Sequence, residues 1–191
     1  MEAIKINVNQ TKAKIIAATI TAIDNQGYQD ISLRQLAQKL GLTTGAVYKH
    51  FANKDDLFFT VAQQLSNDLY QTIAPQVQAD MKAPKQALVT LGVALIQAFE
   101  TAGNKMDFLF FNPSITAVYQ PGASPKDFPL LALTKDVIAK IAQAYPTVDP
   151  ETLFIKVWAF LQGYAMLVRH NVVAIDENLM IQTINDMIGV N

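Results

Sequence analysis

Apolar residues recur at helical spacing along most of the chain, and turn-forming residues divide this pattern into helix-sized segments. In the first segment Ile15, Ile16, Ile20 and Ile23 fall on one helical face, and Gly27 marks its end. No stretch reads convincingly as a strand. The pattern predicts an all-α fold of about nine helices. The expected ranges are about 10–25, 33–40, 44–50, 54–73, 84–101, 105–111, 124–144, 150–170 and 176–188.

Prolines and polar caps set several of these boundaries. Pro75 is expected to end or bend the 54–73 helix, because proline lacks an N–H and clashes with the preceding turn. The stretch 112–124 is the longest loop candidate, and Ser124-Pro125 is typical of a helix start. Asp149 and Asp176 are suited to capping the last two helices.

Residues 31–51 contain two short helical patterns joined by a glycine. Ser32 is a good N-cap, and Gln35 can close a capping box onto it. Gly41 lies where the first helix must end in a left-handed residue, and Thr43 can cap the second helix. Both caps can also donate to a phosphate. The layout indicates a helix-turn-helix, which places its second helix in the major groove of DNA. An ordinary helical hairpin is the alternative from periodicity alone.

The residues of this segment resemble the DNA-binding domain of the tetracycline-repressor (TetR) family. The resemblance rests on Leu36-Ala37-Gln38-Lys39-Leu40-Gly41-Leu42, on Tyr48-Lys49-His50-Phe51 and on Asn53-Lys54-Asp55-Asp56-Leu57. It is strong over residues 10–60 and architectural elsewhere. It implies a three-helix DNA-binding domain, residues 1–55, and a helical bundle for effector binding and dimerisation, residues 56–191. This division falls at the start of the fourth helix, so the two parts would share a helix instead of a linker.

Base edges and phosphates are contacted by different side chains. Arg34 lies in the first turn of the 33–40 helix, and its planar fork can donate to a guanine edge or to a phosphate. A solvated arginine is the alternative. Thr44, Gly45 and Ala46 begin the second helix and are the expected base-facing residues. Because they are small, part of the specificity is expected to come from DNA shape.

Phosphate contacts are expected from the residues that follow. Tyr48 resembles the phosphate-binding tyrosine of the family, and Lys49 and His50 come directly after it. A packed histidine that caps its own helix end is the alternative for His50. Lys54 combines an ammonium group with the free N–H groups of a helix start, which suits a phosphate.

The C-terminal two-thirds of the chain is rich in large apolar residues. The cluster 108–111 lies beside a Pro-Gly loop that could gate a pocket. The candidate ligand-lining residues are Phe99, Met106, Phe110, Phe111 and Trp158. The alternative for each is ordinary core packing. Few ionisable groups lie nearby, so an apolar, uncharged or weakly charged effector is expected.

Gly163 lies in the middle of the 150–170 helix, where glycine costs about 1 kcal/mol relative to alanine. A close helix crossing would compensate for this cost. The resemblance implies a dimer interface built from the last two helices of each chain, and intramolecular packing is the competing explanation.

Composition narrows the class of protein. The chain is 51% hydrophobic, contains no cysteine and has no long uncharged run typical of a membrane span or a secretory signal, so a cytoplasmic protein with a large core is expected. Residues 1–55 hold seven lysines and arginines against four acidic residues, a net charge of +3, which leaves −4 for the remainder. A basic end on an acidic body suits contact with a polyanion.

The function expected from these patterns is that of a DNA-binding regulator, most simply a repressor that a small effector releases from a palindromic or near-palindromic operator in double-stranded DNA. Activation is left open, because it depends on where the operator lies. An enzyme is disfavoured because the chain has only two histidines, scattered carboxylates and no catalytic motif, and we expect no metal or cofactor. A helical ligand carrier that has lost DNA binding is the other alternative.

Overall fold

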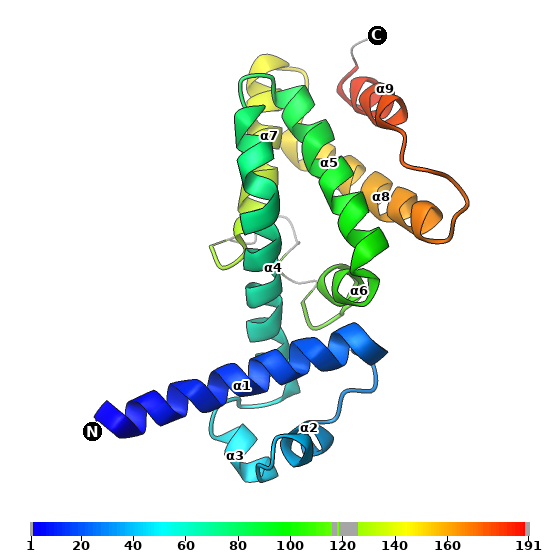
Figure 1. Ribbon diagram of the computed structural model, residues 1–191. Coiled ribbons are helices and arrows are strands. Elements are labelled where there is room, and N and C mark those ends of the chain that lie inside the picture. Colours follow the sequence, from blue (N-terminus) through cyan, green and yellow to red (C-terminus); the bar gives the residue numbers. More distant parts are fainter. Residues whose placement is uncertain (1, 116–117, 119–125, 190–191) are drawn as a thin grey trace. The chain divides into compact units, whose positions relative to one another are not determined.

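The computed structural model describes residues 2–115, 118 and 126–189, with side chains described from Asn9 onward. Within these residues the chain forms nine α-helices and no strand, which confirms the predicted all-α class (Figure 1). The helices are α1 (Glu2–Gln26), α2 (Leu33–Lys39), α3 (Thr44–Tyr48), α4 (Lys54–Ala79), α5 (Pro84–Thr101), α6 (Gly103–Phe111), α7 (Pro129–Ala144), α8 (Pro150–Arg169) and α9 (Glu177–Ile188).

Several helix boundaries differ from the sequence pattern. α1 begins at Glu2, well before the expected start. The apolar residues of 2–9 alternate and form no helical stripe, so the sequence pattern did not indicate that this backbone is helical. α4 continues through Pro75 to Ala79, so of the two expected outcomes, an end or a bend at this proline, the helix does not end there. The lost N–H removes one bond of the helical ladder without stopping it. The predicted helix start at Ser124-Pro125 lies outside the described residues, and α7 begins at Pro129.

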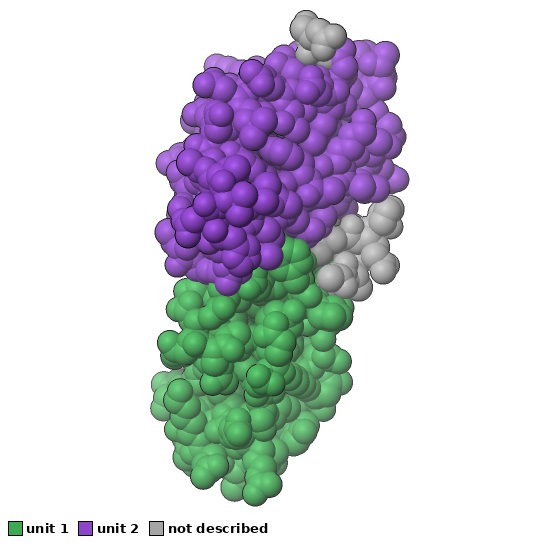
Figure 2. Space-filling view, turned by 90° about the vertical axis from the view of Figure 1, so that its right-hand side faces the viewer, with its two compact units in different colours: residues 1–65, 104–120 green, residues 66–103, 121–191 purple. Residues whose placement is uncertain are grey.

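The chain divides into two compact units (Figure 2). Unit 1 comprises residues 1–65 and 104–120, and unit 2 comprises residues 66–103 and 121–191. The boundary at residues 65 and 66 falls inside α4, so this helix contributes to both units. The compact units therefore do not divide at residue 55. Unit 1 contains the start of α4 and most of α6 together with the helix-turn-helix. The division into a DNA-binding domain, residues 1–55, and an effector-binding bundle, residues 56–191, stays a prediction.

α5 is the central helix of unit 2 and packs against α7, α8 and α9. Its buried residues form one broad face, whereas Gln86, Gln97 and Glu100 on the opposite face are exposed. Gly92 is one of the buried residues, and a Cβ there would meet the ends of the Met180 and Leu161 side chains. The absence of a side chain at this position lets α5 approach α8 and α9 closely.

Among the described residues, no single helix is long and apolar enough to cross a membrane. α5 and α6 reach that length and apolarity only when counted together as a bent pair.

Candidate nucleic-acid interface

Both short helices of the helix-turn-helix begin at the predicted caps. The backbone N–H of Gln35 donates to the Ser32 hydroxyl over 3.5 Å, and that of Ala46 donates to the Thr43 hydroxyl over 3.1 Å. These bonds satisfy N–H groups that a helix start leaves free. The return half of the predicted capping box, from the Gln35 side chain, is not formed. The caps fix the start of α3, which is only five residues long and could not persist in isolation.

The turn between the two helices depends on Gly41. This residue adopts φ +66°, a left-handed conformation that favours glycine. Its N–H donates to the Gln38 carbonyl over 3.1 Å, and the N–H of Leu42 donates to the Ala37 carbonyl over 2.9 Å. The two bonds form a Schellman motif, which satisfies the last carbonyls of α2 and turns the chain toward α3. The predicted role of Gly41 is confirmed.

Only one residue of α3 is buried. Val47 is inaccessible to solvent, and Phe51 just beyond the helix is 1% exposed. These two side chains fix the inner face of α3. The residues predicted to contact DNA occupy the remainder: Gly45, Tyr48 and Lys49 are exposed, whereas Thr44, Ala46 and His50 are half-buried. Tyr48 is 52% exposed, which is high for an aromatic side chain and leaves its hydroxyl accessible.

α2 contributes a second exposed surface to unit 1. Arg34 is exposed in the first turn, next to the capping Ser32. Gln38 lies one helical turn further on the same exposed face, at the i, i+4 position from Arg34.

Lys54 is the first residue of α4. Its ammonium nitrogen lies 4.9 Å from the centroid of the Phe58 ring, and the side chain is half-buried. Asn53 caps the helix by accepting from the N–H of Asp56 over 2.8 Å, and the Asp56 carboxylate accepts from the N–H of Ala52 over 2.8 Å. These bonds order the helix start, and one of them uses the N–H of Asp56, which was predicted to be free for a phosphate.

α6 and the residues after it belong to the same compact unit as the helix-turn-helix. The Tyr28 hydroxyl donates to the Phe111 carbonyl over 3.1 Å, and Lys105 forms a 3.0 Å ion pair with Asp24. The Phe108 ring, fully buried, makes edge contacts with Tyr28 at 5.8 Å and with Phe58 at 5.2 Å. Polar contacts therefore attach α6 to the end of α1, and an aromatic cluster attaches it to α4.

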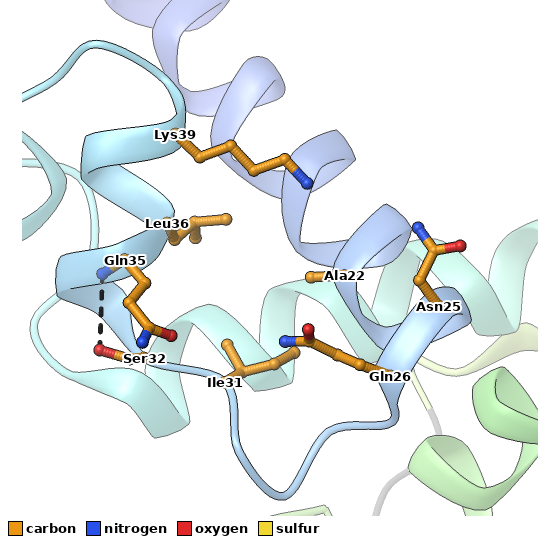
Figure 3. A pocket seen from close by; sticks show the side chains of 8 residues that line it. All are labelled: Ala22, Asn25, Gln26, Ile31, Ser32, Gln35, Leu36 and Lys39. Carbon is orange, nitrogen blue, oxygen red and sulfur yellow. Dashed lines mark hydrogen bonds between the residues drawn. The ribbon is translucent and has the colours of Figure 1, made fainter.

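A cavity of about 210 Å³ opens between α1 and α2 (Figure 3). Ser32 and Gln35 lie at its edge, and Lys39 extends from α2 toward α1. The volume is below that of ordinary ligand pockets, which start at roughly 300 Å³. The remaining lining residues are Ala22, Asn25, Gln26, Ile31 and Leu36.

The five residues predicted to line an effector pocket are divided between the two units. Phe99 is buried in α5, and Trp158 is half-buried in α8, where it stacks on Phe154 at 5.7 Å. Met106 and Phe110 are buried in unit 1, and Phe111 is 36% exposed at the end of α6. Unit 2 thus contains two of the five candidates, and unit 1 contains the other three.

Comparison with known proteins agrees with this architecture. Residues 15–61 match the model of the bacterial regulatory proteins of the tetR family. The chain is 30% identical over 95 residues to the HTH-type transcriptional regulator BetI of Paraburkholderia xenovorans (strain LB400), across 50% of this chain and 49% of that protein. The chain therefore spans about half the length of the curated relatives it matches.

Solved structures extend the likeness to the whole fold. NalD, the secondary repressor of the MexAB-OprM multidrug efflux pump in Pseudomonas aeruginosa, is 18% identical with a TM-score of 0.58 over 96% of both chains. A TetR family member from Streptomyces coelicolor is 19% identical with a TM-score of 0.59, over 92% of this chain and 96% of that one. Residues 15–61, from within α1 to the start of α4, therefore carry the domain of the bacterial regulatory proteins of the tetR family, and the solved structures are similar in fold through α9.

Proposed function

We propose that the chain is a transcriptional regulator that binds double-stranded operator DNA through α2 and α3. The observation that carries the proposal is the exposed face of α3, which two caps and a glycine turn hold in place while Val47 and Phe51 fix its inner side. Small residues at the helix start allow a close approach to base edges, and a phenol and cations follow for the phosphates.

The predicted contacts are assigned within this surface. Arg34, Thr44, Gly45 and Ala46 face base edges. Ser32, Thr43, Tyr48, Lys49, His50 and Lys54 hold phosphates. The exposure of Arg34, Gly45, Tyr48 and Lys49 supports this assignment, because a groove can reach these side chains without any rearrangement of the helices.

We further propose that the chain acts as a homodimer, which matches a palindromic operator. The support is an exposed apolar stripe along α8 that comprises Ile155, Ala159, Gly163, Met166 and Leu167. A Cβ added at Gly163 would meet nothing within 4 Å, so among the described residues no helix crosses close enough to compensate for this glycine. A second copy of α8 could lie against it.

Repression with release by an apolar effector completes the proposal, for a protein acting in the cytoplasm. Phe99 and Trp158 are the candidates within unit 2, and Met106, Phe110 and Phe111 are candidates on α6. A ligand that prefers one position of α4 would shift Lys54, since this helix contributes to both units. A tenfold loss of operator affinity needs about 1.4 kcal/mol of differential binding.

A mobility-shift assay with selection from random-sequence duplexes tests the DNA-binding proposal. We expect enrichment of a palindromic or near-palindromic sequence and loss of binding when Tyr48 and Lys49 are both changed to alanine. A ligand carrier without DNA binding would enrich no sequence and show no shift at any salt concentration. That outcome would refute the proposed function.

A further inference from the structure

Lys12 of α1 lies at the end of the recognition helix. Its ammonium nitrogen is 5.4 Å from the centroid of the Phe51 ring, and Phe51 follows Lys49 and His50 directly after α3. Because Phe51 is 1% exposed, its position is fixed by the core, and the ring holds the Lys12 ammonium beside it by a cation–π interaction. The Lys12 side chain as a whole remains exposed.

Lys54 is held in the same manner over the Phe58 ring. Lys12, Lys49 and Lys54 thus supply three cations from three parts of unit 1: α1, the end of α3 and the start of α4. None of the three has a carboxylate within 4.0 Å among the described residues.

The two acidic residues nearest in sequence are occupied by other groups. Asp55 accepts a hydrogen bond from the Ser114 hydroxyl over 2.7 Å, and Asp56 accepts from the N–H of Ala52 over 2.8 Å. The positive charges of Lys12, Lys49 and Lys54 are therefore not neutralised by ion pairs within the described chain.

We propose that Lys12 is a phosphate-positioning residue that extends the DNA-binding surface from the helix-turn-helix onto α1. The inference rests on the proposed DNA binding. A lysine ammonium is a compact charge suited to a phosphate oxygen, and a fixed ring below it lowers the entropy cost of placing it. Lys12 carries no sequence information in this role, so it sets orientation and affinity on any duplex.

Lys14 provides a matched control on the same helix. It is exposed and has no ring contact or ion pair within the described residues. Two residues along a helix correspond to about 200° around its axis, so Lys14 points away from the side that faces Phe51. A general effect of positive charge on α1 would affect both lysines equally, whereas a positioned contact affects Lys12 alone.

The experiment compares Lys12→Met, Lys12→Arg and Lys14→Met with the wild type. Binding to a random-sequence duplex of about 30 base pairs is measured by fluorescence anisotropy between about 50 and 200 mM KCl. Lys12→Met keeps the apolar stem on Phe51 and removes the charge. For this variant we expect the slope of log affinity against log salt concentration to become shallower by about 0.9 per chain. Its affinity deficit relative to the wild type should therefore shrink about threefold between about 50 and 200 mM KCl. Lys12→Arg and Lys14→Met should keep the wild-type slope.

Several results would overturn the inference. A wild-type slope in Lys12→Met would show that the ammonium only packs on Phe51, and equal losses in Lys12→Met and Lys14→Met would show that position is irrelevant. Thermal unfolding of each variant, with Lys12→Gln as a second charge-removing variant, checks that the fold is unchanged. If the wild-type protein binds no duplex, the proposed function fails together with this inference, whereas normal binding with an unchanged Lys12 slope refutes the inference alone.

Discussion

The Ser114 hydroxyl donates a 2.7 Å hydrogen bond to the Asp55 carboxylate. Asp55 lies in the first turn of α4 directly after Lys54, and Ser114 lies just beyond α6. The bond joins the segment after α6 to the helix start that presents a predicted phosphate contact. It also engages a negative charge that would otherwise be free to pair with Lys54.

This relationship predicts opposite effects for two substitutions. Ser114→Ala releases the Asp55 carboxylate, which can then compete with phosphate for Lys54, so DNA affinity at low salt should fall about two- to fivefold, the range of a surface ion pair. Asp55→Asn removes the charge and should raise the affinity. The double variant should behave like Asp55→Asn in the same anisotropy assay. Weakening by both single changes would contradict this interpretation.

Substitutions of Lys54 and of the base-facing residues should separate affinity from specificity. Lys54→Ala removes a phosphate contact, so it should weaken binding to all sequences alike and lower the salt slope by about one. Arg34→Ala or Thr44→Ala should change the selected sequence and cost about 1–3 kcal/mol at the affected base. Selection from random duplexes measures both effects. A changed preference in Lys54→Ala with none in the other two would reverse the assignment.

Two glycines should respond in opposite ways to alanine. Gly163→Ala meets open space within one chain, so the isolated chain should become more stable by up to about 1 kcal/mol. If Gly163 lies in a dimer interface, the same change should raise the dissociation constant of the dimer. Gly92→Ala forces the Met180 and Leu161 side chains to move and should lower the thermal midpoint. Sedimentation and thermal unfolding measure these effects, and a monomeric wild type at micromolar concentration would refute the dimer proposal.

Tyr28 should make the protein sensitive to alkaline conditions. Partial burial, and to a lesser extent the nearby Asp107 carboxylate, raise the pKa of Tyr28 above its ordinary value of 10.0. The unfolded chain ionises first, so the stability linked to Tyr28 is fully present below pH 10 and is lost as pH rises through the raised pKa. Ionisation also removes the proton donated to the Phe111 carbonyl. Tyr28→Phe should flatten the decline of the unfolding midpoint above pH 10, and an unchanged decline would exclude Tyr28 as its source.

An effector that binds in unit 2 should be detectable through Trp158. This residue is the only tryptophan in the chain, and it lies half-buried against Phe154 in α8. We expect an apolar, uncharged or weakly charged compound to change its fluorescence, raise the thermal midpoint and release DNA. A highly charged compound should not bind, because a buried unpaired charge is costly. If no compound in a hydrophobic screen alters DNA affinity, the effector proposal fails, and DNA binding is judged by its own test.

The local signals of the DNA-binding region could be interpreted from the sequence because they act between neighbouring residues. Ser32, Gly41, Thr43 and Asn53 have the caps and the left-handed turn that their residue types favour. A cap or a glycine turn depends on atoms within a few positions along the chain, so its residue type is sufficient evidence. The period of the apolar residues was sufficient for the all-α class for the same reason.

Contacts between distant segments were decided by the tertiary structure. The sequence gives no signal that α6 packs with α1 and α4 through Phe108, or that Ser114 meets Asp55, since these pairs are far apart along the chain. The aromatic residues of 108–111 indicate burial but do not specify what buries them. Lys12 is an ordinary surface lysine in the sequence, and only folding brings its ammonium group over the Phe51 ring. Local chemistry therefore determined the helices and their ends, whereas the side chains that surround the DNA-binding surface depend on packing between segments that the sequence pattern treats separately.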